Sequence, residues 1–152
     1  MLHVALWEPE IPPNTGNVAR LCAATGTRLH LIGRLGFRLD DRSLRRAGID
    51  YWHAVDVVTH VTFADFEAAL PEGCRIWGVE TPAAVPYTRA EFADGDCLLF
   101  GSESSGLPPS IRERFAERTV GVPMPTGAVR SLNLATTVGI VLYDALRRLH
   151  GW

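Results

Sequence analysis

Short apolar runs alternate with helical patterns along the chain, and this alternation predicts the elements of the fold. Apolar runs of strand length occur at residues 2–7, 28–32, 56–62, 74–79, 97–100 and 119–122. The patterns between them predict helices over residues 15–26, 40–48, 63–70, 108–115 and about 131–149. Strands that alternate with helices are typical of an α/β fold with a mostly parallel sheet flanked by helices. We therefore expect a single domain over residues 1–152.

Capping residues mark several of the predicted helix ends. Gly26 suits the left-handed position that ends a helix, and Gly48 suits the same role at the end of the helix predicted over residues 40–48. Asp40 is placed to cap the start of that helix. Ser131 is a natural N-cap for the last helix, whose free N–H groups would suit an anion or a carboxylate.

Three of the predicted strands end in loops rich in glycine and proline, at residues 80–82, 101–108 and 123–132. Ligands of parallel sheets bind beyond the carboxyl ends of the strands, so we expect one pocket beneath these loops. Gly101 and Gly106 would let the backbone of the second loop approach a ligand closely. Taken alone, that loop is better explained as a plain connection from a strand to a helix that Pro108 begins.

The composition narrows the classes of protein further. The chain has 152 residues, 47% apolar and 21% charged, which is typical of one globular domain with its own core. No apolar run is long enough to span a membrane, and the first ten residues lack the basic region of a secretory signal. We expect a soluble cytoplasmic protein without a membrane partner.

Several motifs and residue types are missing from the sequence. All 15 basic residues are arginine, which excludes a Schiff-base lysine and a phosphate-loop lysine. The G-x-G-x-x-G dinucleotide pattern and the G-x-S-x-G hydrolase pattern are absent. The three cysteines and five histidines are scattered without the spacing of a zinc site. We expect reduced, buried thiols and no bound metal.

One segment is strongly basic although the net charge is −2. Residues 28–48 contain six arginines and two aspartates. A local cluster of this kind is the electrostatic footprint of nucleic-acid binding, but a solvated helix face would have the same composition. Both interpretations remain open for the basic segment proper, residues 34–46, whose five arginines are Arg34, Arg38, Arg42, Arg45 and Arg46.

Residues 8–23, 98–108 and 122–136 together resemble the ordered motifs of the SPOUT superfamily of RNA 2′-O-methyltransferases. Within it, the chain is most similar to the minimal bacterial family that methylates the wobble-position cytidine or uridine of tRNA. The similarity extends nearly from end to end. It implies S-adenosyl-L-methionine as cofactor, a C-terminal trefoil knot, a homodimer and the anticodon stem-loop of tRNA as substrate. The basic segment would then contact the RNA backbone.

The resemblance also assigns roles to particular residues. It implies Arg20 as the catalytic residue, reaching the cofactor of the partner subunit, and Tyr143 as a second candidate that handles RNA. Because a guanidinium stays protonated in proteins, Arg20 suits electrostatic stabilisation better than base catalysis. A surface arginine and an interface tyrosine are the simpler alternatives. The cofactor contacts carried over are Val79, Gly101, Glu103, Val122, Met124, Ser131, Leu132 and Asn133.

The sequence departs from the family pattern at two places. Ser105 stands where related sequences often carry arginine, and the third loop is one residue longer between Met124 and Ser131. Three alternatives to tRNA methylation are left: methylation of another RNA position such as one in rRNA, RNA binding without catalysis, and a hydrolase or nucleotide-binding protein outside the family.

Overall fold

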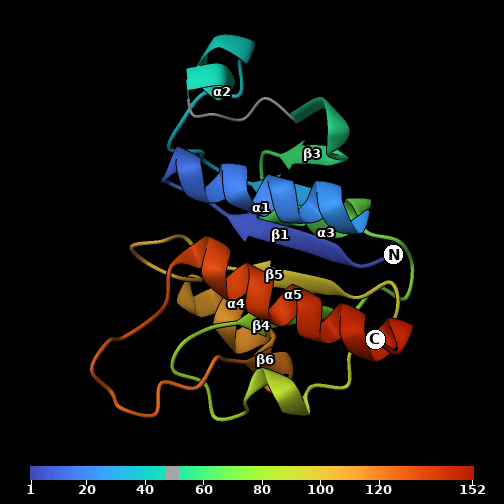
Figure 1. Cartoon of the computed structure of the whole chain (residues 1–152), viewed down its shortest axis with the longest axis vertical. Helices are drawn as coiled ribbons and strands as arrows, with labels where there is room; N and C mark the ends of the chain where they lie inside the picture. The colour runs from blue at the N-terminus through green and yellow to red at the C-terminus, as the bar shows by residue number, and fades with distance from the viewer. Residues whose placement is uncertain (47–51) are drawn as a thin grey trace.

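The computed structural model describes residues 1–46 and 52–152, and its centre is a parallel sheet (Figure 1). The six strands lie in the order β3-β2-β1-β5-β4-β6, and every pairing between them is parallel. They are β1 (His3–Trp7), β2 (Arg28–Ile32), β3 (Val57–His60), β4 (Ile76–Val79), β5 (Cys97–Phe100) and β6 (Thr119–Val120). The predicted parallel α/β architecture is confirmed.

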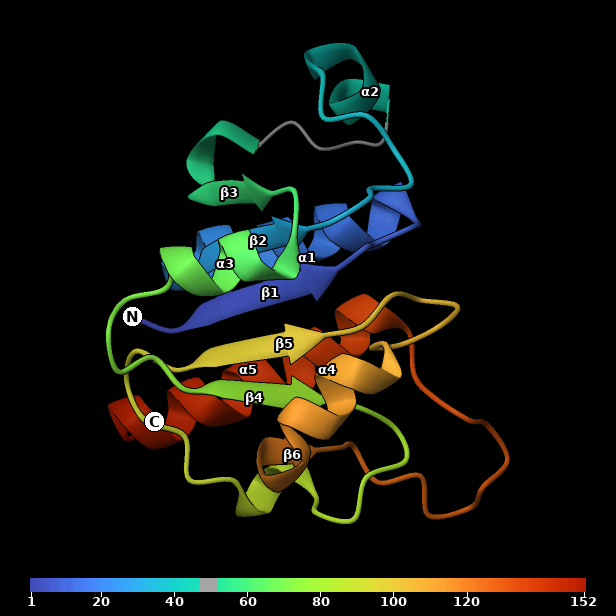
Figure 2. The same cartoon turned by 180° about the vertical axis from the view of Figure 1, so that it is seen from behind.

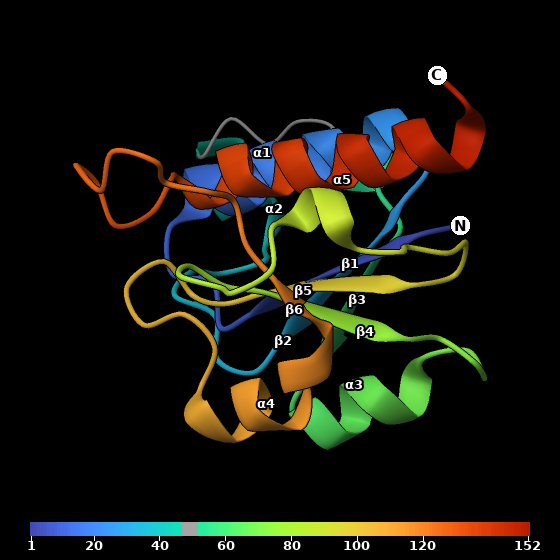
Figure 3. The same ribbon diagram turned by 90° about the horizontal axis from the view of Figure 1, so that it is seen from below.

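Helices cover both faces of the sheet. The longer helices α1 and α5 lie side by side on one face, and α3 and α4 cover the other (Figures 2 and 3). The helices are α1 (Pro12–Thr25), α2 (Asp41–Arg46), α3 (Phe63–Ala69), α4 (Pro109–Arg114) and α5 (Leu134–His150). Short 3₁₀ turns occupy Trp52–Ala54, Tyr87–Arg89 and Ala116–Arg118. Within the described ranges, no helix has both the length and the apolar character needed to cross a membrane.

The alternation of side chains along each strand fills two separate cores. Val4 and Leu6 of β1 belong to the core under α1 and α5, whereas Ala5 belongs to the core under α3 and α4. Both faces are covered, so the strands read as nearly continuous apolar runs in the sequence. This is why the strand positions are predictable.

The cysteines are all free thiols, as expected. Cys22 and Cys97 are buried, but Cys74 is only partly buried. Burial raises the pKa of Cys22 to about 12. Cys22 and Cys97 therefore act as small apolar core residues.

Two helices begin at different residues from those predicted. Helix α1 starts at Pro12 rather than Thr15, because proline at the first helical position loses no hydrogen bond. The prediction that Ser131 caps the last helix is wrong: α5 starts at Leu134, and the Asn133 side chain accepts the Thr136 N–H at 3.2 Å. Asparagine satisfies this donor as well as serine does.

The other predicted caps have different outcomes. Gly26 adopts a left-handed conformation with φ 67° at the end of α1, as predicted. Asp40 accepts the Ser43 N–H at 2.8 Å, so the predicted cap of α2 is confirmed. Gly48 lies outside the described residues.

A row of three buried histidines crosses β1, β2 and β3. His30 lies in the middle, with 3.0 Å from its Nε2 to His3 Nδ1 and 3.0 Å from its Nδ1 to His60 Nε2. Phe66 of α3 packs edge-on against His30 and His60. Burial lowers the pKa of all three rings, that of His30 to about 3. Neutral imidazoles, each with one donor and one acceptor nitrogen, can form both hydrogen bonds of this row.

We predict that acid weakens the fold through this row. The folded-state pKa values lie below 6.5, so the unfolded chain binds more protons as the pH falls from 6.5 towards 3. The charge of Arg28 also lowers the pKa of His30, whereas the charge of Asp56 raises it. Because the unfolded histidine is half protonated at pH 6.5, the free energy of unfolding in urea should fall by about 1.6 kcal/mol between pH 6.5 and pH 5 through His30, with a limiting slope of about 1.4 kcal/mol per pH unit.

The variant His30→Gln should lose this part of the pH dependence, while a substitution at an exposed histidine, His53→Gln, should keep it. Equal slopes for His30→Gln and the unsubstituted protein would contradict the prediction.

Candidate functional site

The loops that follow β1 and β5 meet at the carboxyl edge of the sheet. The strand order reverses between these two strands, which lie side by side at the middle of the sheet. Such a reversal leaves a crevice where the connecting loops diverge, and ligands of open parallel sheets bind there. Residues 8–11 and 101–108 form the two loops.

A cavity of about 550 Å³ opens at this edge. Its volume is within the usual range for small-molecule sites. All three glycine- and proline-rich loops contribute to it, so the single pocket predicted beneath them is confirmed. Its lining includes Val79, Glu80, Phe100, Gly101, Ser102, Glu103, Arg112, Arg130, Ser131, Leu132 and Asn133.

Glu103 joins the β5 loop to the start of α1. Its Oε1 accepts the N–H of Glu10 at 3.0 Å, and its Oε2 accepts the N–H of Ile11 at 2.7 Å. Ile11, the N-cap residue, offers no side-chain acceptor of its own. A carboxylate at this position satisfies free donors and is stabilised by the helix dipole.

The same carboxylate begins a line of amide hydrogen bonds that reaches α5. Glu103 Oε2 accepts from Asn14 Nδ2 at 3.3 Å, and Asn14 Oδ1 accepts from Asn133 Nδ2 at 2.9 Å. Asn14 is buried, and Asn133 also caps α5. The line Glu103–Asn14–Asn133 therefore holds the β5 loop, the first turn of α1 and the start of α5 together.

Two further glutamates hold the β5 loop in place. Glu10 Oε1 accepts from the Ser104 N–H at 3.1 Å and from its hydroxyl, and these bonds lower the pKa of Glu10. The Glu80 carboxylate accepts the Leu107 N–H, and burial raises its pKa. The loop closes on itself so tightly that a Cβ at Gly101 would lie 2.1 Å from a Gly106 backbone atom. Only glycine fits there.

A second cavity, of about 760 Å³, shares the β5 loop as a wall with the first. Arg34 and Arg112 line it from two different segments, together with Trp7 and Ser105. In the part of the chain that the structure describes, neither guanidinium forms an ion pair. Glu8 and Glu10 also line this cavity, so two guanidinium groups and two carboxylates lie beside the first cavity.

The remaining arginines of the basic segment lie beyond this second cavity. Arg38 and Arg46 line a third cavity next to the first turn of α1. Arg42 and Arg45 are exposed on α2. The basic segment thus borders the site rather than forming it.

Six of the eight predicted cofactor contacts line the first cavity, and their role in binding stays a prediction. They are Val79, Gly101, Glu103, Ser131, Leu132 and Asn133. Val122 and Met124 are not among the lining residues. Sequence reasoning missed Asn14, Glu80, Arg112 and Arg130. Glu80 directly follows a predicted strand, and a polar residue at that position indicates the ligand-binding edge of a parallel sheet.

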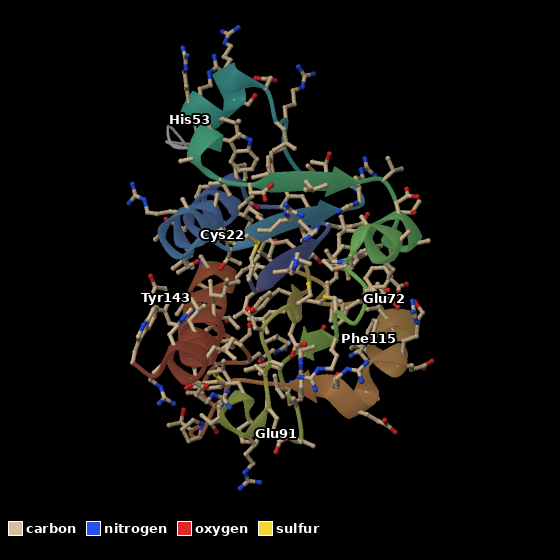
Figure 4. All side chains as sticks on the ribbon, turned by 90° about the vertical axis from the view of Figure 1, so that its right-hand side faces the viewer. Cys22, His53, Glu72, Glu91, Phe115 and Tyr143 are labelled. Atoms are coloured by element: carbon tan, nitrogen blue, oxygen red, sulfur yellow. The ribbon has the colours of Figure 1, made fainter. Side chains whose placement is uncertain are left out.

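The two predicted catalytic residues lie outside the cavity. Arg20 is exposed on α1, and Tyr143 is exposed on α5, where Figure 4 shows it on the side away from the sheet. The helices pack closely, since Leu21 lies 3.7 Å from the position a Cβ would take at Gly139. Arg20 and Tyr143 therefore belong to the outer surface of the helix pair.

The described residues contain no group of three or more His, Cys, Asp or Glu side chains that could hold a metal ion. Fold and site together define a parallel α/β domain with a small-molecule pocket at the switch point of its sheet. The SpoU rRNA Methylase family matches residues 1–143, and the chain belongs to this family.

Relatives and solved structures match most of the chain. The tRNA (cytidine(34)-2′-O)-methyltransferase of Escherichia coli K12 is 45% identical over 151 residues, covering 98% of this chain and 94% of the relative. A solved structure described as giving insights into the 2-OH methylation of C/U34 on tRNA is 51% identical, with a TM-score of 0.93, and covers 100% of this chain and 98% of that one.

A more distant structure, an AdoMet-bound rRNA methyltransferase from Sinorhizobium meliloti, is 27% identical with a TM-score of 0.80. It covers 97% of this chain and 56% of the longer one.

We predict that Glu103→Ala lowers the free energy of unfolding by about 1–2 kcal/mol, because it removes the acceptor at the start of α1. Urea unfolding measures the change. Glu113→Ala, at an exposed glutamate on α4, serves as the control and should change stability by less than about 0.5 kcal/mol. Equal stabilities for the two variants would show that the cap contributes nothing.

Proposed function

We propose that this protein transfers a methyl group from S-adenosyl-L-methionine to the ribose 2′-hydroxyl of the wobble-position cytidine or uridine of tRNA. The observation that carries the proposal is the convergence of the three motif loops on one cavity, beside a second cavity to which Arg34 and Arg112 contribute. The relative from Escherichia coli, which matches nearly end to end, is named for this reaction at cytidine 34.

The residues of the first cavity fit the proposed cofactor. Val79, Phe100 and Leu132 supply apolar walls for an adenine ring. The Glu80 carboxylate places negative charge near a sulfonium group, and Arg130 offers a partner for a carboxylate. Bound there, the cofactor supplies a methyl group that is already activated for transfer. The AdoMet-bound structure from Sinorhizobium meliloti supports this assignment.

The second cavity suits the RNA substrate. Arg34 and Arg112 would bind backbone phosphates next to the methylated nucleotide, since guanidinium groups match phosphate geometry. Such contacts place the ribose without reading the sequence. The shared β5 loop brings the two ligands together, and alignment of this kind is the main requirement for transfer of an activated group.

Arg20 would act in the partner subunit of a homodimer. The exposed face of α1 and α5, which carries Arg20 and Tyr143, supports packing about a two-fold axis. There, Arg20 of the partner subunit would stabilise negative charge on the 2′-oxygen as it loses its proton. Tyr143 would contact RNA or lie in the interface.

The chain would also form a C-terminal trefoil knot within a single domain over residues 1–152. Gly121, just after β6, exchanges backbone hydrogen bonds with Val85 and Tyr87 at 3.0 and 2.9 Å. Arg148, near the end of α5, donates to the carbonyl oxygens of Tyr87 and Ala90. These contacts support a path in which the end of the chain passes against the loop after β4. Its tRNA substrate would place the protein in the cytoplasm.

The activity is tested by incubating the protein with labelled S-adenosylmethionine and total tRNA from a strain that lacks it. We expect label on the 2′-oxygen of nucleotide 34, found by nucleoside mapping. Parallel incubation with ribosomal RNA tests the alternative substrate. Label in ribosomal RNA alone, or in neither RNA, would overturn the proposal.

We predict that Arg20→Ala reduces methyl transfer at least about 100-fold, because charge stabilisation of this kind is worth that much. Cofactor binding, measured by calorimetry, should change little, since Arg20 lies outside the cavity of its own chain. Arg89→Ala, at another exposed arginine, should keep full activity. Unchanged turnover in Arg20→Ala would remove Arg20 from the mechanism.

A further inference from the structure

A third cavity, of about 430 Å³, lies between the first turn of α1 and the segment around α2. Its walls are largely apolar: Pro12 and Pro13 on one side, and Phe37 and Leu44 on the other. Leu44 is buried, whereas Phe37 is only partly covered, so part of the ring remains open to a ligand. The cavity is of a size that takes a small planar molecule.

Positive charge surrounds this apolar cavity. Arg38 and Arg46 are part of its lining, and Arg42 and Arg45 lie nearby on α2. Asp40 accepts the Ser43 N–H and also interacts electrostatically with Arg38. An aromatic ring and proline rings with arginines beside them match a nucleotide, whose base stacks on flat apolar surfaces and whose phosphate binds guanidinium groups.

The third cavity and the cofactor cavity share one wall. Ile11 and Asn14 line the cofactor cavity, while the intervening Pro12 and Pro13 line the third cavity. The two cavities thus lie on opposite sides of the first turn of α1. A helix with its side chains is about 10–12 Å across. A single-stranded RNA loop can span this distance and contact both cavities at once.

We propose that the third cavity binds an unpaired base of the substrate RNA, next to the nucleotide that is methylated. This inference rests on the proposed function. The base would stack against Phe37 and the two prolines, and Arg38 and Arg46 would contact its flanking phosphates. The protein would then hold the RNA loop at two points, one on each side of the start of α1.

The test uses anticodon stem-loop RNAs in which each loop base in turn is replaced by an abasic site. For the unsubstituted protein, one abasic position beside nucleotide 34 should weaken binding about 10-fold or more, because base stacking on an aromatic ring is worth about 1–3 kcal/mol. In Phe37→Leu, which keeps an apolar side chain but removes the ring, that position should no longer matter. Val61→Ala, at an exposed turn, serves as the control and should keep the unsubstituted profile.

Thermal unfolding and cofactor calorimetry show whether Phe37→Leu is folded; if it is not, Ser43→Tyr, which fills the cavity, gives the same readout. An abasic profile in the variant equal to that of the unsubstituted protein overturns the inference. The inference is also overturned if the variant changes its oligomeric state but keeps the abasic profile. The third cavity would then be part of an interface between copies of the chain. If the unsubstituted protein neither binds the RNA nor transfers a methyl group to it, the proposed function is overturned instead.

Discussion

The start of α1 points its free N–H groups at the carboxyl edge of the sheet, and the site depends on how these groups are satisfied. Ile11 at the cap position has no side-chain acceptor, and the N–H groups of Glu10 and Ile11 itself point away from the helix ladder. Glu103 supplies the acceptor from the other half of the sheet. Satisfying a helix end in this way also decides where the β5 loop lies, and through Asn14 and Asn133 where the third loop lies. Helix capping and construction of the cavity are the same set of contacts.

Much of the fold was predictable, because its signals are local. The strands β1, β2, β4 and β5 are buried on both sides and therefore appear as apolar runs, and the long helix α5 has its buried residues at helical spacing. The loops that build the cavity were also predictable, since glycine and proline mark them and parallel sheets bind ligands at one edge. Strand order was not, because it depends on how the crossovers pass one another. Nothing in a linear pattern states that β5 lies beside β1.

The errors have two physical causes. The start of α1 was misplaced because prolines open the helix, and the cap of α5 was misplaced because Asn133, rather than Ser131, accepts the Thr136 N–H. The row of His3, His30 and His60 was missed for a different reason: its members are spread over the first sixty residues and meet only when three strands align. Burial and partners across the sheet, rather than spacing along the chain, set the protonation of such groups. Asn14 was likewise invisible until its two partners were placed.

The line from Glu103 through Asn14 to Asn133 spans nearly the whole chain, with sequence separations of 89 and 119 residues between bonded partners. A polypeptide leaves the ribosome from its N-terminus, so the first half of the sheet emerges long before these partners exist. The pocket therefore forms only after Asn133 has been synthesised. A nascent chain that ends before Asn133 has no formed pocket with which to sequester a ligand, so ligand binding shows that both halves of the sheet are in place.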